Sequence, residues 1–211
     1  MKGLLGLIRQ TTPASSGSES RAETFFFSTA FADQGIDASF MVPWEARANE
    51  VGAKHLAPGR GAKLLEELWS QDSFMSRLGP DALKRLEKFF DFASLPANRD
   101  VIRQDEYGNF MLVLLSGSIA VDREQPWGER LHLTEARPGD ILGEMSLLDS
   151  GPRFSVCTSL NDCEIAILGA QGLDEMMVAD PALAASLIAL LARKLSRRMR
   201  VVSARLGEKK S

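Results

Sequence analysis

The chain has 211 residues, of which 45% are hydrophobic and 25% charged, as is typical of one soluble globular domain with an extension. The formal net charge of −3 provides no overall basic excess that would favour nucleic-acid binding. No apolar run reaches the roughly 18–20 residues that span a bilayer, and no signal-peptide core is present, so we expect a cytoplasmic protein without a membrane span.

Metal and catalytic motifs are missing from the sequence. Its two cysteines, Cys157 and Cys163, form no CxxC pair, and we interpret them as reduced, buried thiols. A cupin-type metal site would need several histidines beside a carboxylate, whereas the chain has only His55 and His132. Because no nucleophile and base share a recognisable motif, we predict that the protein is not an enzyme and needs no metal or cofactor.

The first 60 residues differ in composition from the rest of the chain. Six of the ten residues 11–20 are Ser or Thr, which is typical of a linker. Five phenylalanines without a helical or strand period then follow: Phe25, Phe26, Phe27, Phe31 and Phe40. We expect a weakly structured extension over 1–60, whose phenylalanines either dock on the domain or a partner or form a sticky, partly ordered tail.

Two helices are expected next. The first covers 62–70, and its apolar face consists of Leu64, Leu65, Leu68 and Trp69. The second covers about 80–92; Pro80 and Asp81 suit its first turn, and its apolar stripe consists of Leu83, Leu86, Phe89 and Phe90.

Short strands separated by turns follow between about 93 and 170. The turn signals recur at roughly 8–12 residues, a spacing that predicts an antiparallel sandwich or jelly roll. The expected strands are Asp100–Arg103, Phe110–Leu115, Ser118–Asp122, Arg130–Thr134, Phe154–Leu160 and Glu164–Leu168.

The C-terminal part is expected to be helical over 171–206, with a short tail at 207–211. Asp180 and Pro181 suit an N-cap and a first helical position. One apolar stripe then runs through Leu183, Leu187, Leu191, Leu195, Met199, Val202 and Leu206. Because this helix is longer than a domain of this size requires, we predict a homodimer through 181–206.

The segment from Pro138 to Val156 contains the residues that we expect to bind a ligand. Gly143 precedes a short helical stretch that begins at Glu144, and Arg153 follows nine residues after that glutamate. A helix N-terminus attracts an anion, and the arginine fork can hold a phosphate with two hydrogen bonds. Since a carboxylate repels phosphate, Glu144 is expected to accept a hydrogen bond from a neutral sugar hydroxyl. The pattern therefore predicts a ligand with both groups, such as a ribose cyclic phosphate.

The sequence GDILGE, followed by PRFS, resembles the phosphate-binding cassette of cyclic-nucleotide-binding domains. These domains occur in the catabolite activator protein, in protein kinase A regulatory subunits and in channels. The resemblance extends over roughly 62–206, through Gly108-Asn109 and the run LVLLSGSIAV. It implies an α+β fold over 61–206, an antiparallel jelly-roll barrel flanked by N-terminal helices and a long C-terminal lid helix.

The resemblance also assigns roles to individual residues. Glu144 would accept the ribose 2′-hydroxyl, and Arg153 would bind the exocyclic phosphate oxygens. The other residues that would line the cradle and the base pocket are Gly143, Met145, Phe154, Ser155, Ile119, Leu133 and Thr134. The lid positions that contact adenine in the activator protein hold Arg198 and Met199 here, so the base contacts do not carry over. An arginine there can stack on a purine or bond a guanine edge.

The resemblance leaves the output of the protein open. In transcription factors of this family a helix-turn-helix domain follows the lid helix, whereas only GEKKS follows here, so we expect no direct DNA reading. We predict a stand-alone bacterial sensor of a cyclic mononucleotide, cAMP first, that signals to an unidentified partner protein through the lid helix or the extension.

Three alternatives remain at this point. The ligand could be cGMP or a cyclic dinucleotide, or the protein could be a dimeric scaffold that binds no nucleotide. It could also bind nucleic acid through the basic residues of the last helix, Arg193, Lys194, Arg197, Arg198 and Arg200, although a solvated helix face is the simpler interpretation. Nucleic-acid binding would weaken steeply as salt rises, which separates it from the other two.

Overall fold

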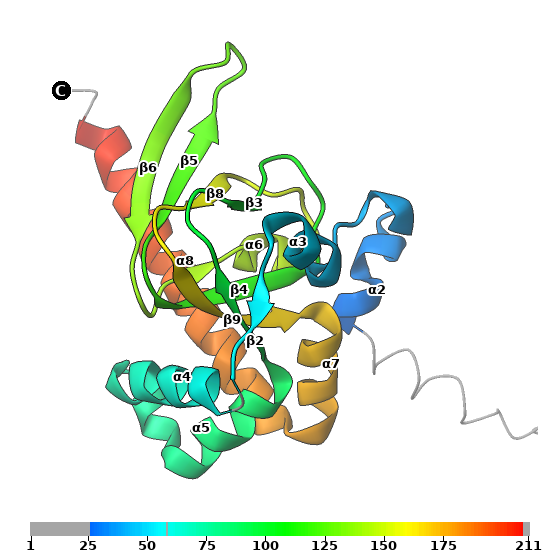
Figure 1. Ribbon diagram of the computed structural model, residues 1–211, viewed down its shortest axis with the longest axis vertical. Coiled ribbons are helices and arrows are strands. Elements are labelled where there is room, and N and C mark those ends of the chain that lie inside the picture. Colours follow the sequence, from blue (N-terminus) through cyan, green and yellow to red (C-terminus); the bar gives the residue numbers. More distant parts are fainter. Residues whose placement is uncertain (1–25, 58, 209–211) are drawn as a thin grey trace, which may run out of the picture.

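The computed structural model describes residues 26–57 and 59–208, with side chains as far as 204 (Figure 1). Two antiparallel sheets form its centre. The five-stranded sheet has the order β1 (Lys54–His55), β2 (Asp91–Leu95), β9 (Cys163–Gly169), β4 (Phe110–Ser116), β7 (Ile141–Leu142). The four-stranded sheet has the order β3 (Asp100–Ile102), β8 (Val156–Ser159), β5 (Ile119–Glu124), β6 (Arg130–Ala136). The predicted jelly-roll fold is confirmed.

Strand β4 explains how the two halves of the core meet. Residues 110–115 are all buried, because both faces of this strand are covered. Met111 and Val113 face the helices, whereas Leu112 and Leu114 face the second sheet. This alternation follows from the two-residue period of a strand. The five-stranded sheet therefore lies between a helical layer and the four-stranded sheet.

The helical layer has two parts. The first comprises α4 (Arg60–Gln71), the 3-10 helix η3 (Met75–Leu78), α5 (Pro80–Leu86) and the 3-10 helix η4 (Glu87–Phe89). The second comprises α7 (Ala170–Ala179) and α8 (Pro181–Glu208), and α8 runs along the whole molecule (Figure 1). The predicted helix over 80–92 was wrong at its end, because Asp91–Leu95 pairs with β9 as strand β2.

The predicted start of the last helix is correct. The Asp180 carboxylate accepts a hydrogen bond from the Leu183 N–H at 3.2 Å, and Pro181 is the first helical residue. The apolar stripe is buried as far as Leu191, beyond which the side chains are half-buried or exposed. Met199 is 66% exposed, so this part of the stripe is not covered by any of the residues that the structure describes.

The N-terminal region differs from the expectation of a weakly structured extension. Residues 26–57 contain α2 (Phe26–Asp33), the 3-10 helix η2 (Ala38–Phe40), α3 (Trp44–Val51) and strand β1, and the expectation was wrong for this part. The reason is burial: Phe27, Phe31, Trp44 and Val51 all pack into the domain. Of the two interpretations of the phenylalanine cluster, docking holds for Phe27 and Phe31, while Phe25 lies outside the described residues.

Candidate functional site

The cassette begins with a glycine that the backbone and its neighbours both require. Gly143 lies between β7 and the short helix α6 (Glu144–Asp149) and has a φ of +78°, in the left-handed region. A Cβ at this position would lie 2.6 Å from Nη1 of Arg153 and 2.9 Å from Cδ1 of Ile102. Only glycine lets the main chain pass this close to the arginine.

Arg153 is the buried cation of the site, with only 3% of its surface exposed. Its Nη1 donates to the carbonyl of Gly143 and its Nη2 to the carbonyl of Phe110, both at 2.7 Å. The guanidinium also lies over the Phe110 ring, 4.6 Å from its centroid. The lack of a side chain at Gly108 leaves space for the Arg153 guanidinium, because a Cβ at this position would lie 2.6 Å from Nη2.

The charge of Arg153 has no acidic partner within ion-pair distance among the described residues. Burial lowers the pKa of Arg153 to about 10, which keeps the side chain protonated at neutral pH. Two of its five N–H groups bond to backbone carbonyls, so three have no hydrogen-bond partner among the described residues. The site thus holds a buried cation with spare donors.

Glu144 is buried as well, with 3% of its surface exposed. Its Oε1 accepts a hydrogen bond from Nη1 of Arg198 at 2.7 Å, and this contact attaches α8 to the cassette. Sequence reasoning selected both residues but did not foresee that they pair. The pair offsets the negative charge that would otherwise repel a phosphate beside Arg153.

The other predicted site residues are more widely distributed. Gly143, Glu144, Arg153 and Arg198 come together, while Met145 and Phe154 are 38% and 50% exposed. Phe154 instead carries the Arg123 guanidinium over its ring at 4.1 Å. Ser155 is half-buried, 4.0 Å from the Cys157 sulfur.

The predicted base-pocket residues lie on neighbouring strands. Ile119 on β5 is fully buried, and Leu133 on β6 packs against the same part of the core. Thr134, next along β6, is exposed and pairs across the ladder with Val121. Their contact with a base stays a prediction.

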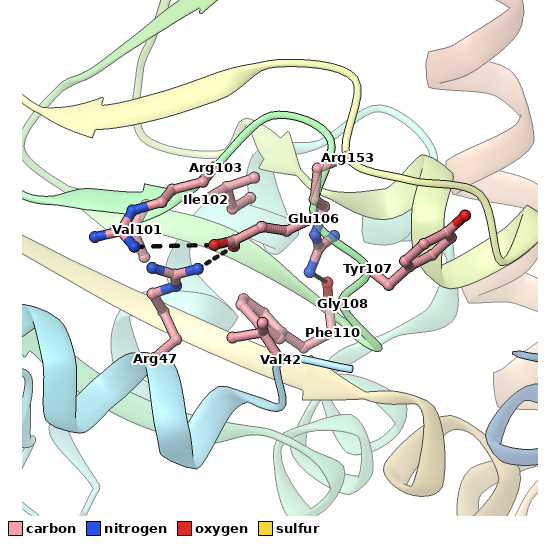
Figure 2. Close-up of a pocket in the computed structure, with 10 residues that line it drawn as sticks. All are labelled: Val42, Arg47, Val101, Ile102, Arg103, Glu106, Tyr107, Gly108, Phe110 and Arg153. Atoms are coloured by element: carbon pink, nitrogen blue, oxygen red, sulfur yellow. Dashed lines mark hydrogen bonds and ion pairs between the residues drawn. The ribbon is translucent and has the colours of Figure 1, made fainter. Parts of the chain in front are cut away.

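A small cavity beside Arg153 was not anticipated from the sequence (Figure 2). This cavity is shallow and filled: its empty space of about 160 Å³ includes open solvent, and the side chains that line it leave no room for a water molecule. Arg47, Arg103 and Glu106 line it together with Arg153, and both of the other arginines reach the Glu106 carboxylate. The available signal was the helical spacing of Trp44, Ala48 and Val51, which places Arg47 on a helix that packs on the domain.

The remaining candidate groups behave as ordinary structural residues. Both cysteines are free and buried, and burial raises the pKa of the Cys157 thiol to about 12. His132 is exposed beside Asp122, and within the described part of the chain no cluster of His, Cys, Asp and Glu is suited to a metal ion. None of the helices in that part is both long enough and apolar enough for a membrane span.

The basic residues of α8 are not all free in solvent. Arg193 stacks over the Phe74 ring at 5.1 Å, and Lys194 donates to the carbonyl of Gly139 at 3.0 Å. Together with Arg197 they line a groove against the turn that contains Asp72.

Comparison with known proteins identifies the family of the central domain. Residues 92–180 match the model of the cyclic nucleotide-binding domain. The chain is 26% identical over 133 residues to the CRP-like cAMP-activated global transcriptional regulator of Mycobacterium tuberculosis, covering 63% of this chain and 59% of that protein. It is 29% identical over 118 residues to the cyclic AMP receptor protein of Thermus thermophilus, covering 56% and 55%. The chain thus spans little more than half the length of these relatives.

The fold comparison agrees with the sequence comparison. A cyclic nucleotide-binding domain from Methylobacillus flagellatus superposes with a TM-score of 0.68 at 20% identity, covering 74% of this chain and 89% of that one. The matched stretch contains Gly143, Glu144 and Arg153, the residues of the buried cradle. The predicted resemblance is confirmed, and residues 92–180 of this chain form a domain of the cyclic nucleotide-binding family.

Proposed function

We propose that this chain is a regulator that binds a cyclic mononucleotide, cAMP in the first instance, in a cradle formed by Gly143, Glu144 and Arg153. The observation that carries the proposal is the buried Arg153, which stays charged and forms no ion pair in the described part of the chain. A buried cation without a counter-ion is costly, and an anionic ligand would offset that cost.

The names of the relatives support cAMP as the first ligand to test. One relative is described as cAMP-activated and another as a cyclic AMP receptor, and both align with this chain at 26–29% identity. In the proposed complex, the three spare N–H groups of Arg153 bond the exocyclic phosphate oxygens. The Glu144 carboxylate accepts the ribose 2′-hydroxyl. Met145, Phe154 and Ser155 complete the cradle.

Arg198 connects the proposed ligand site to helix α8. It bonds the same carboxylate that the ribose would use, so ligand binding and the position of α8 are linked. A ligand shifts such an equilibrium only by its differential affinity for the two helix positions. We propose that the altered surface of α8, or of the N-terminal helices, is presented to a partner protein.

Calorimetric titration tests the proposal. The purified protein is titrated with cAMP, cGMP and cyclic di-GMP, beside Arg153→Ala and the matched control Arg130→Ala, whose side chain pairs with Glu124 on the exposed hairpin. Arg153→Ala removes the partner of the phosphate, so its binding free energy should be weaker by on the order of 2–5 kcal/mol. The control should bind with the affinity of the parent. Absence of saturable binding to all three nucleotides would reject the proposal.

A second candidate function is a dimeric scaffold that binds no nucleotide. The exposed apolar side chains of α8, Met199, Val201 and Val202, favour it, because they are 48–66% exposed on one helix end. The scaffold predicts normal self-association with no effect of nucleotide, so the same titration separates the two functions.

A further inference from the structure

Residues 26–51, here called the N-terminal arm, lie outside the matched family domain yet contact the loop beside Arg153. The Val42 N–H donates to the carbonyl of Tyr107 at 2.8 Å. The Phe31 ring packs edge-on against Tyr107 with centroids 6.5 Å apart, and Trp44 packs against Phe110 at 5.5 Å. Phe110 is the residue whose ring and carbonyl hold the Arg153 guanidinium.

The buried side chain of Arg47 makes a second polar contact between the arm and this loop. This side chain is 2% exposed and donates to the carboxylate of Glu50. It also donates to the carboxylate of Glu106 (Figure 2). Glu106 is 30% exposed and is also 3.9 Å from Arg103. Because Arg47 is charged and buried, its removal would leave Glu106 without its closest cation.

Glu106 in turn fixes the main chain of Arg153. The Arg153 N–H donates to the carbonyl of Glu106 at 2.7 Å, and the Asp105 N–H donates to the carbonyl of Arg153 at 2.8 Å. Asp105 has a φ of +64°, so the loop turns sharply between these two bonds. The position of the Glu106 main chain therefore determines the position of the Arg153 Cα atom, from which the side chain extends.

The other end of the arm is anchored on α7. The Asp174 carboxylate is 1% exposed and accepts hydrogen bonds from the N–H groups of Phe27 and Ser28 at 2.9 Å, and from the Ser28 hydroxyl at 2.7 Å. It acts as an N-cap for α2, supplied from 146 residues further along the chain. Figure 1 shows α2 beside α7, so the arm bridges the closing helices and the loop at Arg153.

We infer that Arg47 is a positioning residue for Arg153, acting through Glu106, and that the arm links the phosphate cradle to α7. The inference deepens the proposed function and rests on it, since Arg153 is taken as the phosphate ligand. In metal sites, replacing an outer residue that orients a ligand side chain typically changes affinity by about 10–100-fold, and we take the lower end of this range for Arg47. We expect about tenfold weaker cAMP binding when the contact of Arg47 with Glu106 is lost.

The first test uses two variants and two readouts. Arg47→Met removes the charge but keeps the volume, and Glu106→Gln removes the partner charge at a half-exposed site where misfolding is a smaller risk. The nucleotide-free readout is the NMR signal of Arg153 Nε–H, assigned by its loss in Arg153→Lys. Its shift and its exchange with water should change in both variants but not in Arg60→Met, which breaks an arginine–glutamate pair elsewhere.

The second test separates positioning from a general loss of structure. Calorimetry with cAMP compares Arg47→Met in the parent and in the Arg153→Lys background. If Arg47 acts through Arg153, its roughly tenfold effect should largely vanish in the second background. Equal losses in both backgrounds, or an unchanged Arg153 signal in the folded variants, would overturn the inference. Should the parent bind no nucleotide at all, the proposed function fails, while the NMR readout still decides whether Arg47 positions Arg153.

Discussion

Three single glycine-to-alanine substitutions distinguish the effect of backbone strain from the effect of displacing the Arg153 side chain. Gly143→Ala combines both, because its φ is +78° and its Cβ would meet Arg153 and Ile102. Gly128→Ala in the β5–β6 turn has a φ of +88° but meets no atom within 4 Å. Gly108→Ala has no left-handed backbone, and the three atoms nearest to its Cβ all belong to the Arg153 guanidinium.

The magnitudes follow from those contacts. Left-handed backbone costs a non-glycine residue about 1–2 kcal/mol, and overpacking adds about 1–3 kcal/mol. Gly128→Ala should therefore lose about 1–2 kcal/mol of unfolding free energy and keep full nucleotide affinity. Gly143→Ala should lose about 2–5 kcal/mol of unfolding free energy and bind the nucleotide poorly. Gly108→Ala should unfold almost like the parent yet bind weakly, because a flexible side chain moves more easily than the main chain.

Urea unfolding and calorimetry with cAMP check all three variants. The decisive variant is Gly108→Ala, which should change affinity while leaving stability nearly intact. Full affinity in Gly108→Ala and Gly143→Ala, with both folded, would refute the reasoning that the guanidinium must occupy the space between these two glycines to bind phosphate.

Three further predictions concern other parts of the molecule. Glu144→Gln should weaken binding of cAMP but not of its 2′-deoxy analogue, and calorimetry showing equal losses would contradict the assigned contact with the ribose. Because burial raises the pKa of the Cys157 thiol to about 12, this thiol should stay protonated at pH 8 and react with Ellman's reagent only after unfolding. Rapid reaction of Cys157 in the native protein would contradict this prediction. If the exposed end of α8 mediates a dimer, Met199→Glu should shift the protein to monomer in analytical ultracentrifugation, and an unchanged sedimentation coefficient would argue against it.

The cradle could be predicted because its information is local. A glycine with positive φ, a glutamate one residue later and an arginine after nine more residues all lie within one turn-helix-turn segment. The strands followed for the same reason, since a two-residue period and turn signals act over a few residues. The start of strand β2 was missed because Leu83, Leu86, Phe89 and Phe90 fit one helical stripe, which extended the predicted helix to about 92. Only pairing with β9, some 70 residues later, makes Asp91–Leu95 a strand.

The contacts that the sequence could not predict join distant positions. Glu144 and Arg198 are 54 residues apart, Arg47 and Glu106 are 59 apart, and Phe27 and Asp174 are 147 apart. Each contact joins a polar side chain to a partner far away in the sequence, and the helical pattern that places Arg47 or Arg198 on a helix does not indicate that partner. Polar residues of this kind cannot be distinguished from solvent-exposed ones until the fold is known.

The cap that Asp174 provides for α2 also bears on where the cooperative unit of this protein begins. The match to the family model starts at residue 92, but the first amides of α2 are protected by a carboxylate on α7. Backbone amides in one cooperative unit exchange with solvent together, so α2 and α7 should open in the same event. The segment that matches the family model and the segment that unfolds as one body would then have different limits, with the second extending to about residue 26.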